Sequence, residues 1–201
     1  MNPGFSKLPE ERRNQIINAG FRIFAQNAYK KAPVAEIAAE AGISKSLLFY
    51  HFKNKKELYL FLWQKAIELT RKEMTEQNVL GTKDYFEMMI RSLRGKCNLI
   101  RKYPYASEFS LRAYYEQNPE IGLEIQNNFR EISAESEKIL MSLIDTTTLR
   151  DDINLQEIYK EMIWAADGYM HTVIMRGNID ANLIELDFGK LIAMWKKVYH
   201  K

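Results

Sequence analysis

Residues 35–58, which read AEIAAEAGISKSLLFYHFKNKKEL, limit the possible folds more than any other stretch of the chain. The first part of this stretch has apolar residues at positions i, i+3, i+4 and i+7, which predicts a helix with one buried face. These residues are Val34, Ile37, Ala38 and Ala41. Gly42 can adopt the left-handed backbone that ends a helix, and Ile43 then returns to the core. The sequence therefore predicts a short helix followed by a tight turn.

A second short helix is predicted directly after the turn, over residues 45–52. Ser44 is a favourable N-cap for it, and Asn54 with Glu57 predicts a capping box at the start of a further helix. Lysine, serine, tyrosine and histidine occur on the second helix. Two helices joined by a tight turn, with such side chains facing solvent on the second, form the arrangement that places a recognition helix in the DNA major groove.

The charge of the chain is unevenly distributed. Residues 1–56 contain 10 Lys and Arg against 4 Asp and Glu, a net charge of +6, whereas the remaining 145 residues contain 19 against 22, a net charge of −3. A basic head on a mildly acidic body is the footprint expected of a module that meets phosphate through one face. The charge pattern therefore supports a nucleic-acid interface in the first quarter of the chain.

Bulk composition indicates a soluble protein. Hydrophobic residues make up 46% of the 201 residues, and charged residues 27%. These are ordinary values for a globular chain, and no apolar run approaches the 18 residues of a membrane span. The opening residues MNPGFSKLPEERR lack the apolar core of a signal peptide. The single Cys97 excludes an intramolecular disulfide and fits a reducing compartment, so we expect a cytoplasmic protein.

The segment from about Glu11 to Ala66 resembles the DNA-binding region of the TetR family of bacterial transcriptional regulators. The resemblance includes the preceding apolar-striped helix RRNQIINAGFRIFAQNAY, the Ala-Gly-Ile-Ser turn, the Phe-Tyr-His-Phe run and the sequence Lys-Asn-Lys-Lys-Glu-Leu. It implies a homodimeric, all-helical regulator whose C-terminal domain usually binds a small ligand. Repression is the usual function in the family, and activation is the alternative.

The chain departs from the family pattern at three places. Phe49 stands where tyrosine is usual, so one hydroxyl-to-phosphate bond is missing. Ala28 replaces the glycine that usually precedes the aromatic at position 29, and we expect Asn27 to take the left-handed conformation instead. Ala32, followed by Pro33, replaces the usual Thr or Ser cap of the next helix.

We predict an all-α fold of about nine helices in two domains. Residues 1–54 form a three-helix helix-turn-helix DNA-binding domain, and residues 55–201 form a larger helical ligand-binding and dimerisation domain. Helices are expected near residues 55–77, 82–101, 105–115, 119–144, 155–175 and 182–200. Pro119 lies in the first turn of one of them, and Gly177 with Asn178 ends the helix before the last.

Seven residues on or beside the predicted second helix are candidate DNA contacts. Lys45 is suited to a guanine or a phosphate, and Ser46 to a base edge or a backbone oxygen. Tyr50 can donate to phosphate, and Lys55 adds charge at the start of the next helix. The full set is Ser44, Lys45, Ser46, Phe49, Tyr50, His51 and Lys55. The alternative for His51 is local packing, and Leu48 and Phe52 are expected in the core.

The second domain is rich in aromatic residues and methionine, which could line a ligand cavity between helices. The candidate lining residues are Trp63, Phe86, Met89, Phe109, Arg112, Trp164 and His171. Arg112 would favour an anionic ligand, or it faces solvent. The alternative for the aromatic residues is an ordinary core.

The last two helices are the candidate dimer surface. Two antiparallel copies would form a four-helix bundle, as the resemblance implies, and would hold two recognition helices at the spacing of two half-sites. The candidate interface residues are Ile158, Met162, Ala165, Tyr169, Leu191, Met194 and Trp195. The alternative is that these faces serve only the intrachain core.

We predict no enzyme, cofactor or metal site. The sequence lacks a phosphate-binding glycine loop, HExxH, CxxC and a nucleophile elbow. Cys97 with His171 is the one conceivable Cys–His dyad. The preferred hypothesis is a homodimeric repressor that a small ligand releases from double-stranded operator DNA. The alternative is a DNA-binding protein without a ligand, whose second domain is a filled scaffold.

Overall fold

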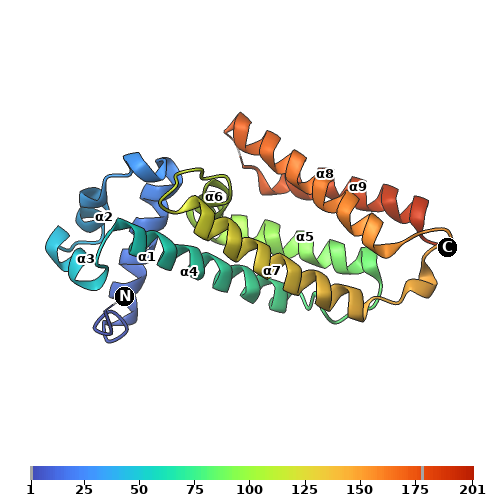
Figure 1. Cartoon of the computed structure of the whole chain (residues 1–201), viewed down its shortest axis with the longest axis horizontal. Helices are drawn as coiled ribbons and strands as arrows, with labels where there is room; N and C mark the ends of the chain where they lie inside the picture. Colours follow the sequence, from blue (N-terminus) through green and yellow to red (C-terminus); the bar gives the residue numbers. More distant parts are fainter. Residues whose placement is uncertain (1, 178) are drawn as a thin grey trace. The chain divides into compact units, whose positions relative to one another are not determined.

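The computed structural model describes residues 2–177 and 179–201. Within these residues the chain forms nine α-helices and two short 3₁₀ turns (Figure 1). Packing divides it into two compact units. Unit 1 comprises residues 1–69 and 103–131, and unit 2 comprises residues 70–102 and 132–201. Two long helices, α4 (Lys55–Glu76) and α7 (Gly122–Leu143), begin in unit 1 and end in unit 2.

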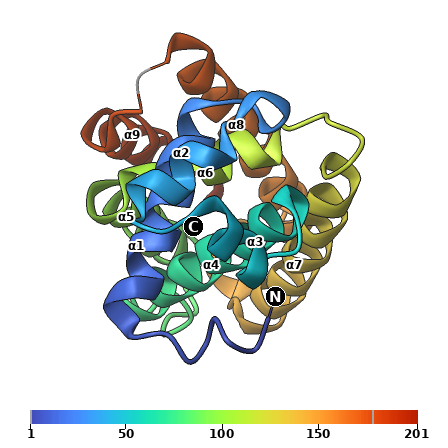
Figure 2. The same cartoon turned by 90° about the vertical axis from the view of Figure 1, so that its left-hand side faces the viewer.

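Unit 1 contains four complete helices and the first parts of α4 and α7. The complete helices are α1 (Glu10–Gln26), α2 (Val34–Glu40), α3 (Lys45–His51) and α6 (Pro104–Tyr114). A 3₁₀ turn, η1 (Tyr29–Lys31), joins α1 to α2. Helix α1 packs against both α2 and α6. Figures 1 and 2 both show α2 and α3 close together beside the start of α4.

Aromatic rings fill the centre of unit 1. The Tyr59 ring of α4 lies 4.8 Å from the rings of both Phe24 and Phe109, measured between centroids. Gly20 lets α1 and α4 approach closely, because a Cβ at this position would lie 2.7 Å from a methyl carbon of Leu62. Burial of these large side chains holds the small α2–α3 pair to a rigid base.

Unit 2 contains α5 (Tyr85–Lys102), α8 (Leu155–Arg176), α9 (Ala181–Tyr199), the last parts of α4 and α7, and a 3₁₀ turn, η2 (Thr146–Thr148). Helix α9 packs on α5. Polar side chains join α8 to α9: Glu161 accepts hydrogen bonds from the Trp195 indole at 3.1 Å and the Tyr199 hydroxyl at 2.6 Å.

A buried carboxylate joins α4 to α5 within unit 2. Glu73 is 1% exposed, and its two oxygens accept hydrogen bonds from the Lys102 ammonium at 2.8 and 3.0 Å. The same ammonium also pairs with Glu76 at 2.9 Å. A buried charge is tolerated when it is paired in this way, so Lys102 compensates the desolvation of Glu73.

The predicted all-α fold is confirmed, and most helix boundaries agree within a few residues. Helix α7 begins at Gly122 rather than at 119, because residues 119–121 form a turn. The expectation for Asn27 is wrong: its φ is −135°, and its side-chain amide instead donates to the Ile23 carbonyl at 2.9 Å. Gly177 ends α8 in the left-handed conformation, with φ of 72°, while Asn178 lies outside the described residues.

The predicted boundary between a DNA-binding domain (residues 1–54) and a ligand-binding and dimerisation domain (residues 55–201) stays a prediction. The packing units follow a different boundary, because residues 103–131 pack with the helix-turn-helix region rather than with the rest of the second predicted domain. Among the described residues, no helix is both long enough and apolar enough to cross a membrane.

Candidate nucleic-acid interface

The turn between α2 and α3 forms as its residues predict. Gly42 has a φ of 65°, in the left-handed region, and the Ile43 amide donates to the Ala38 carbonyl at 2.9 Å. The Ser44 hydroxyl caps α3 by accepting a hydrogen bond from the Leu47 amide at 3.1 Å. Leu48 is fully buried and fixes which face of α3 points outward. The local sequence thus determines both the start and the rotation of this helix.

Four side chains form the outward face of α3. Lys45 and Ser46 are exposed, Leu47 is 41% exposed and Tyr50 is 60% exposed. The Ser44 and Ser46 hydroxyls lie 2.9 Å apart, and the Lys45 ammonium lies 5.9 Å from the centre of the Phe49 ring. This face presents one cation, hydroxyl groups and an apolar side chain. Such groups can contact phosphate, base edges and thymine methyl groups respectively.

His51, one of the candidate DNA contacts, points into the protein. The His51 ring is 3% exposed, and neither ring nitrogen has a hydrogen-bond partner among the described residues. Burial lowers the pKa of His51, so the ring is neutral near pH 7. Because both ring nitrogens are buried, His51 cannot reach a phosphate in this conformation.

The ammonium of Lys55 is bound within its own chain. It donates to the Ala32 carbonyl at 2.7 Å and the Lys30 carbonyl at 3.2 Å, and it lies 5.1 Å from the centre of the Tyr29 ring. Desolvation lowers the pKa of Lys55. Its role in this structure is to hold the turn before α2. Phe49, another of the candidate DNA contacts, is half-buried.

The capping box predicted at the start of α4 is present. The Asn54 side-chain oxygen accepts from the Glu57 amide at 2.8 Å, and the Glu57 carboxylate accepts from the Lys53 amide at 2.9 Å. This box fixes the turn through which α3 leads into α4.

Sequence reasoning missed two residues of this region, Leu47 and Phe5. Leu47 lies on the exposed side of α3 together with Lys45 and Ser46. A helical projection that places Leu48 in the core would have shown that Leu47 is exposed. Phe5 is 2% exposed and packs against the Phe52 and Phe61 rings. No periodic pattern surrounds Phe5, so its burial was not predictable from the sequence.

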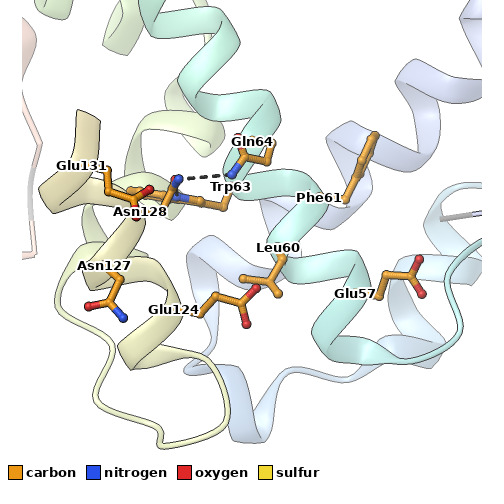
Figure 3. A pocket seen from close by; sticks show the side chains of 9 residues that line it. All are labelled: Glu57, Leu60, Phe61, Trp63, Gln64, Glu124, Asn127, Asn128 and Glu131. Carbon is orange, nitrogen blue, oxygen red and sulfur yellow. Dashed lines mark hydrogen bonds between the residues drawn. The ribbon is translucent and has the colours of Figure 1, made fainter. Parts of the chain in front are cut away.

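A groove of about 530 Å³ lies in unit 1, between α4 and α7 (Figure 3). Three carboxylates line it: Glu57, Glu124 and Glu131. Glu124 pairs with Lys56 at 2.9 Å, and the Trp63 indole donates to the Asn128 side chain at 2.8 Å. The other lining residues are Leu60, Phe61, Gln64 and Asn127.

The seven candidate ligand-lining residues do not share one unit. Trp63, Phe109 and Arg112 belong to unit 1, whereas Phe86, Met89, Trp164 and His171 belong to unit 2. Phe109 and Phe86 are core residues, at most 1% exposed. Arg112 is exposed and pairs with Glu108 at 3.1 Å. Met89 is half-buried, His171 is exposed, and Trp164 is 71% exposed. Of the seven, Trp63 lines the groove.

Most of the candidate dimer residues lie inside the protomer. Ile158, Met162 and Trp195 are 2–4% exposed and belong to the core of unit 2. Ala165, Tyr169 and Leu191 are half-buried against that core. Met194 is 50% exposed. The predicted face is thus largely the intrachain face, because it packs α8 and α9 onto their own unit.

A second apolar face of α8 and α9 is exposed. On α8 it contains Trp164 and Met175, with Gly168 between them at helical spacing. On α9 the exposed apolar residues are Leu183, Leu186, Ala193, Met194 and Val198. We name this set the outer face of α8 and α9. Exposed apolar side chains that share one face of a helix are candidates for an interaction surface.

Chemistry at cysteine or a metal finds no support in the described residues. They contain no group of three or more His, Cys, Asp or Glu placed to hold a metal ion. The Cys97 side chain is fully buried, and burial raises the pKa of its thiol to about 11. A thiol with such a pKa is a poor nucleophile near neutral pH.

Residues 16–61 match the family model described as bacterial regulatory proteins, tetR family. This segment is a TetR-family DNA-binding domain. It contains α2, the glycine turn and α3. The family consists of DNA-binding regulators rather than enzymes.

Named relatives of this chain are transcriptional regulators. One is the activator FasR of Mycolicibacterium smegmatis, 41% identical over 64 residues, which span 31% of this chain and 29% of FasR. The alignment thus spans less than a third of that relative's length. Two solved structures share the fold over nearly the whole chain. A TetR-family regulator from Chloroflexus aurantiacus superposes with a TM-score of 0.70 and 19% identity, over 100% of this chain and 98% of that one. The regulator FadR from Bacillus subtilis, solved in complex with stearoyl-CoA, has a TM-score of 0.70 and 17% identity, over 89% of this chain and 96% of that one.

Proposed function

We propose that the outward face of α3 reads a specific DNA sequence. The observation that carries this proposal is the joint exposure of Lys45, Ser46, Leu47 and Tyr50 on one helix whose opposite side is fixed by buried Leu48. Lys45 and Tyr50 would contact phosphate or guanine, Ser46 a base edge, and Leu47 a thymine methyl group. Ser44 mainly caps the helix. His51 and Lys55 support the interface from within.

We propose that the protein acts as a homodimer through the outer face of α8 and α9. The supporting observation is the exposure of large apolar side chains there, with Trp164 71% and Leu186 54% exposed. Covering such side chains in a symmetric four-helix contact removes apolar area from water twice, once on each copy. A dimer would also present two α3 helices to the two halves of a near-palindromic operator.

We propose repression that a small ligand relieves. A ligand that binds the non-operator conformation more tightly shifts the population away from DNA. The B. subtilis FadR structure contains stearoyl-CoA, so long-chain acyl-CoA thioesters are the first ligands to test. The competing proposal is a regulator without a ligand. The groove in unit 1 does not by itself choose between them, because two of its three carboxylates already have partners within the chain.

The experiment is a fluorescence-anisotropy titration with DNA from upstream of the protein's own gene, across a salt series. A random duplex tests specificity, and the Lys45→Ala/Tyr50→Ala variant tests the assigned face. Lys72→Ala/Tyr105→Ala is the matched control, since both of these side chains are exposed and lie on helices other than α3. We expect tight, salt-sensitive binding to the upstream DNA, lost in the α3 variant and kept in the control. Intact binding by the α3 variant would assign DNA recognition to another surface.

Acyl-CoA is then added to the preformed complex. Release by a long-chain acyl-CoA, but not by free CoA, supports the ligand proposal. Release by no member of an acyl-chain series supports the regulator without an acyl-CoA ligand.

A further inference from the structure

Residues 2–8 fold into a series of turns rather than an extended tail. The Phe5 amide donates to the Asn2 carbonyl at 3.0 Å, and the Leu8 amide donates to the Phe5 carbonyl at 3.2 Å. The Ser6 hydroxyl donates to the Pro3 carbonyl at 2.7 Å. Local hydrogen bonds of this kind give a short segment a defined shape. We name it the 2–8 segment.

Phe5 anchors the 2–8 segment in the helix-turn-helix region. Its ring is 2% exposed and lies 5.0 Å from the Phe52 ring, 5.3 Å from the Phe61 ring and 5.6 Å from the His51 ring, measured between centroids. Burying a phenylalanine side chain is among the larger favourable contributions that one residue can make. A second attachment comes from α1, where the Arg13 guanidinium donates to the Ser6 carbonyl at 2.7 Å.

The 2–8 segment also caps the C-terminal end of α3. His51 is the last residue of this helix, and its carbonyl accepts a hydrogen bond from the Asn2 amide at 2.9 Å. The last carbonyls of a helix have no partner within the helix, so such a bond satisfies one of them. Helix α3 has seven residues, and a helix this short depends on caps and packing for its stability.

The same segment lies against the exposed aromatic residue of α3. A Cβ at Gly4 would lie 3.8 Å from Cε1 of Tyr50, which is ordinary van der Waals contact. The Tyr50 ring also lies 5.4 Å from the His51 ring, which Phe5 covers. Tyr50 is therefore close to both the 2–8 segment and His51, while 60% of it remains exposed.

We propose that the 2–8 segment is part of the DNA-recognition apparatus, and that Phe5 is a positioning residue that sets the end of α3 and the Tyr50 side chain for contact with the operator. The inference rests on the proposed function of α3. It also accounts for the inward position of His51: the ring provides the surface on which Phe5 packs instead of reaching DNA. The sequence match to the family begins at residue 16, so the 2–8 segment lies outside it.

The test is a double-mutant cycle with Phe5→Ala and Tyr50→Ala, read as operator affinity in the full chain. If Phe5 acts through Tyr50, Phe5→Ala should weaken operator binding about tenfold in the wild-type background and little in the Tyr50→Ala background. Phe5→Leu, which keeps an apolar anchor, should restore most of the affinity. Equal losses in both backgrounds would overturn the coupling. Tighter binding by Phe5→Ala would also overturn it, because the segment would then cover the interface instead of positioning it.

Two controls separate this result from general damage. Circular dichroism with thermal unfolding establishes that each variant is folded at the titration temperature. Phe188→Leu loosens the core of unit 2, to which neither α3 nor the 2–8 segment belongs, and should leave operator affinity nearly unchanged. The proposed function fails if Lys45→Ala/Tyr50→Ala leaves operator binding intact. If that variant loses binding while Phe5→Ala keeps it, the present inference alone fails.

Discussion

Replacing Trp164 by alanine should weaken the proposed dimer strongly. Trp164 is the largest exposed apolar side chain on α8, and 71% of it is exposed in the protomer. A tryptophan side chain offers roughly 200 Å², so about 140 Å² is available to a partner. At about 25 cal/mol per Å², complete coverage would contribute about 3.5 kcal/mol per copy.

The expected effect on dissociation follows from symmetry. If about half of the available Trp164 area is covered, each copy contributes about 1.7 kcal/mol, and the two copies of a symmetric dimer about 3.5 kcal/mol. Since about 1.4 kcal/mol corresponds to a factor of ten, the dimer dissociation constant should rise about 300-fold in Trp164→Ala.

Sedimentation velocity over a concentration series measures this constant directly. Leu80→Ala is the control, because Leu80 is 57% exposed in the α4–α5 connection, outside the outer face of α8 and α9. The control should dimerise as the wild type does. An unchanged dissociation constant for Trp164→Ala would refute the assignment of this face, and a monomeric wild type at micromolar concentration would refute the dimer itself.

Four further substitutions test the packing. Lys102→Met leaves the buried Glu73 carboxylate without its ammonium partner and should lower the free energy of unfolding in urea titrations, by less than for a fully buried pair because Lys102 is half exposed. Burial lowers the pKa of His51, so the native state binds fewer protons than the unfolded state as pH falls below about 6.5. Stability is therefore present at pH 7.5 and declines towards pH 5, and His51→Phe should reduce that decline in parallel unfolding titrations. Gly20→Ala should destabilise by about 1–3 kcal/mol, because its Cβ would lie 2.7 Å from a leucine methyl of α4. Gly189→Ala has open space around the new Cβ and should gain up to about 1 kcal/mol in thermal unfolding of the monomer.

The helix-turn-helix was predictable because its signals are local. Gly42, Ser44 and Asn54 each act within four residues of their own position, through backbone conformation or a capping hydrogen bond. Leu48 and Phe52 were assigned correctly to the core because helical spacing alone requires it. Where the interactions that determine an element join residues close together in the sequence, the sequence pattern and the structure agree.

The faces of α8 and α9 were not predictable from periodicity, for a physical reason. Both helices are apolar on more than one side: Ile158 and Met162 face the core of unit 2, while Trp164 and Met175 face outward. A periodic pattern locates an apolar stripe, but it does not say which of two stripes packs within the chain. The sequence therefore led to the intrachain face as the dimer surface.

The inward positions of His51 and Lys55 depend on segments far away in the sequence. His51 is covered by Phe5, and Lys55 is bound by the carbonyls of Lys30 and Ala32. From sequence alone, a basic residue next to a recognition helix suggests a phosphate contact. The sequence does not show that the N–H donors of Lys55 are already bonded to backbone carbonyls. Long-range capping of this kind leaves no periodic trace, so packing was only the alternative for His51 in the sequence, and Lys55 was assigned to DNA.

Substitutions of outward-facing residues and of internally bound residues in this region should have different effects on stability and DNA affinity. Lys45 and Tyr50 point outward, so replacing them removes groups that DNA could contact and leaves the packing of α3 largely unchanged. His51 and Lys55 satisfy or cover groups of the protein itself, so replacing them changes the fold of the helix-turn-helix first and DNA affinity only as a result. A loss of operator binding in a Lys55 variant therefore does not by itself establish a phosphate contact. Only a loss at unchanged stability, with a reduced dependence of affinity on salt, would do so.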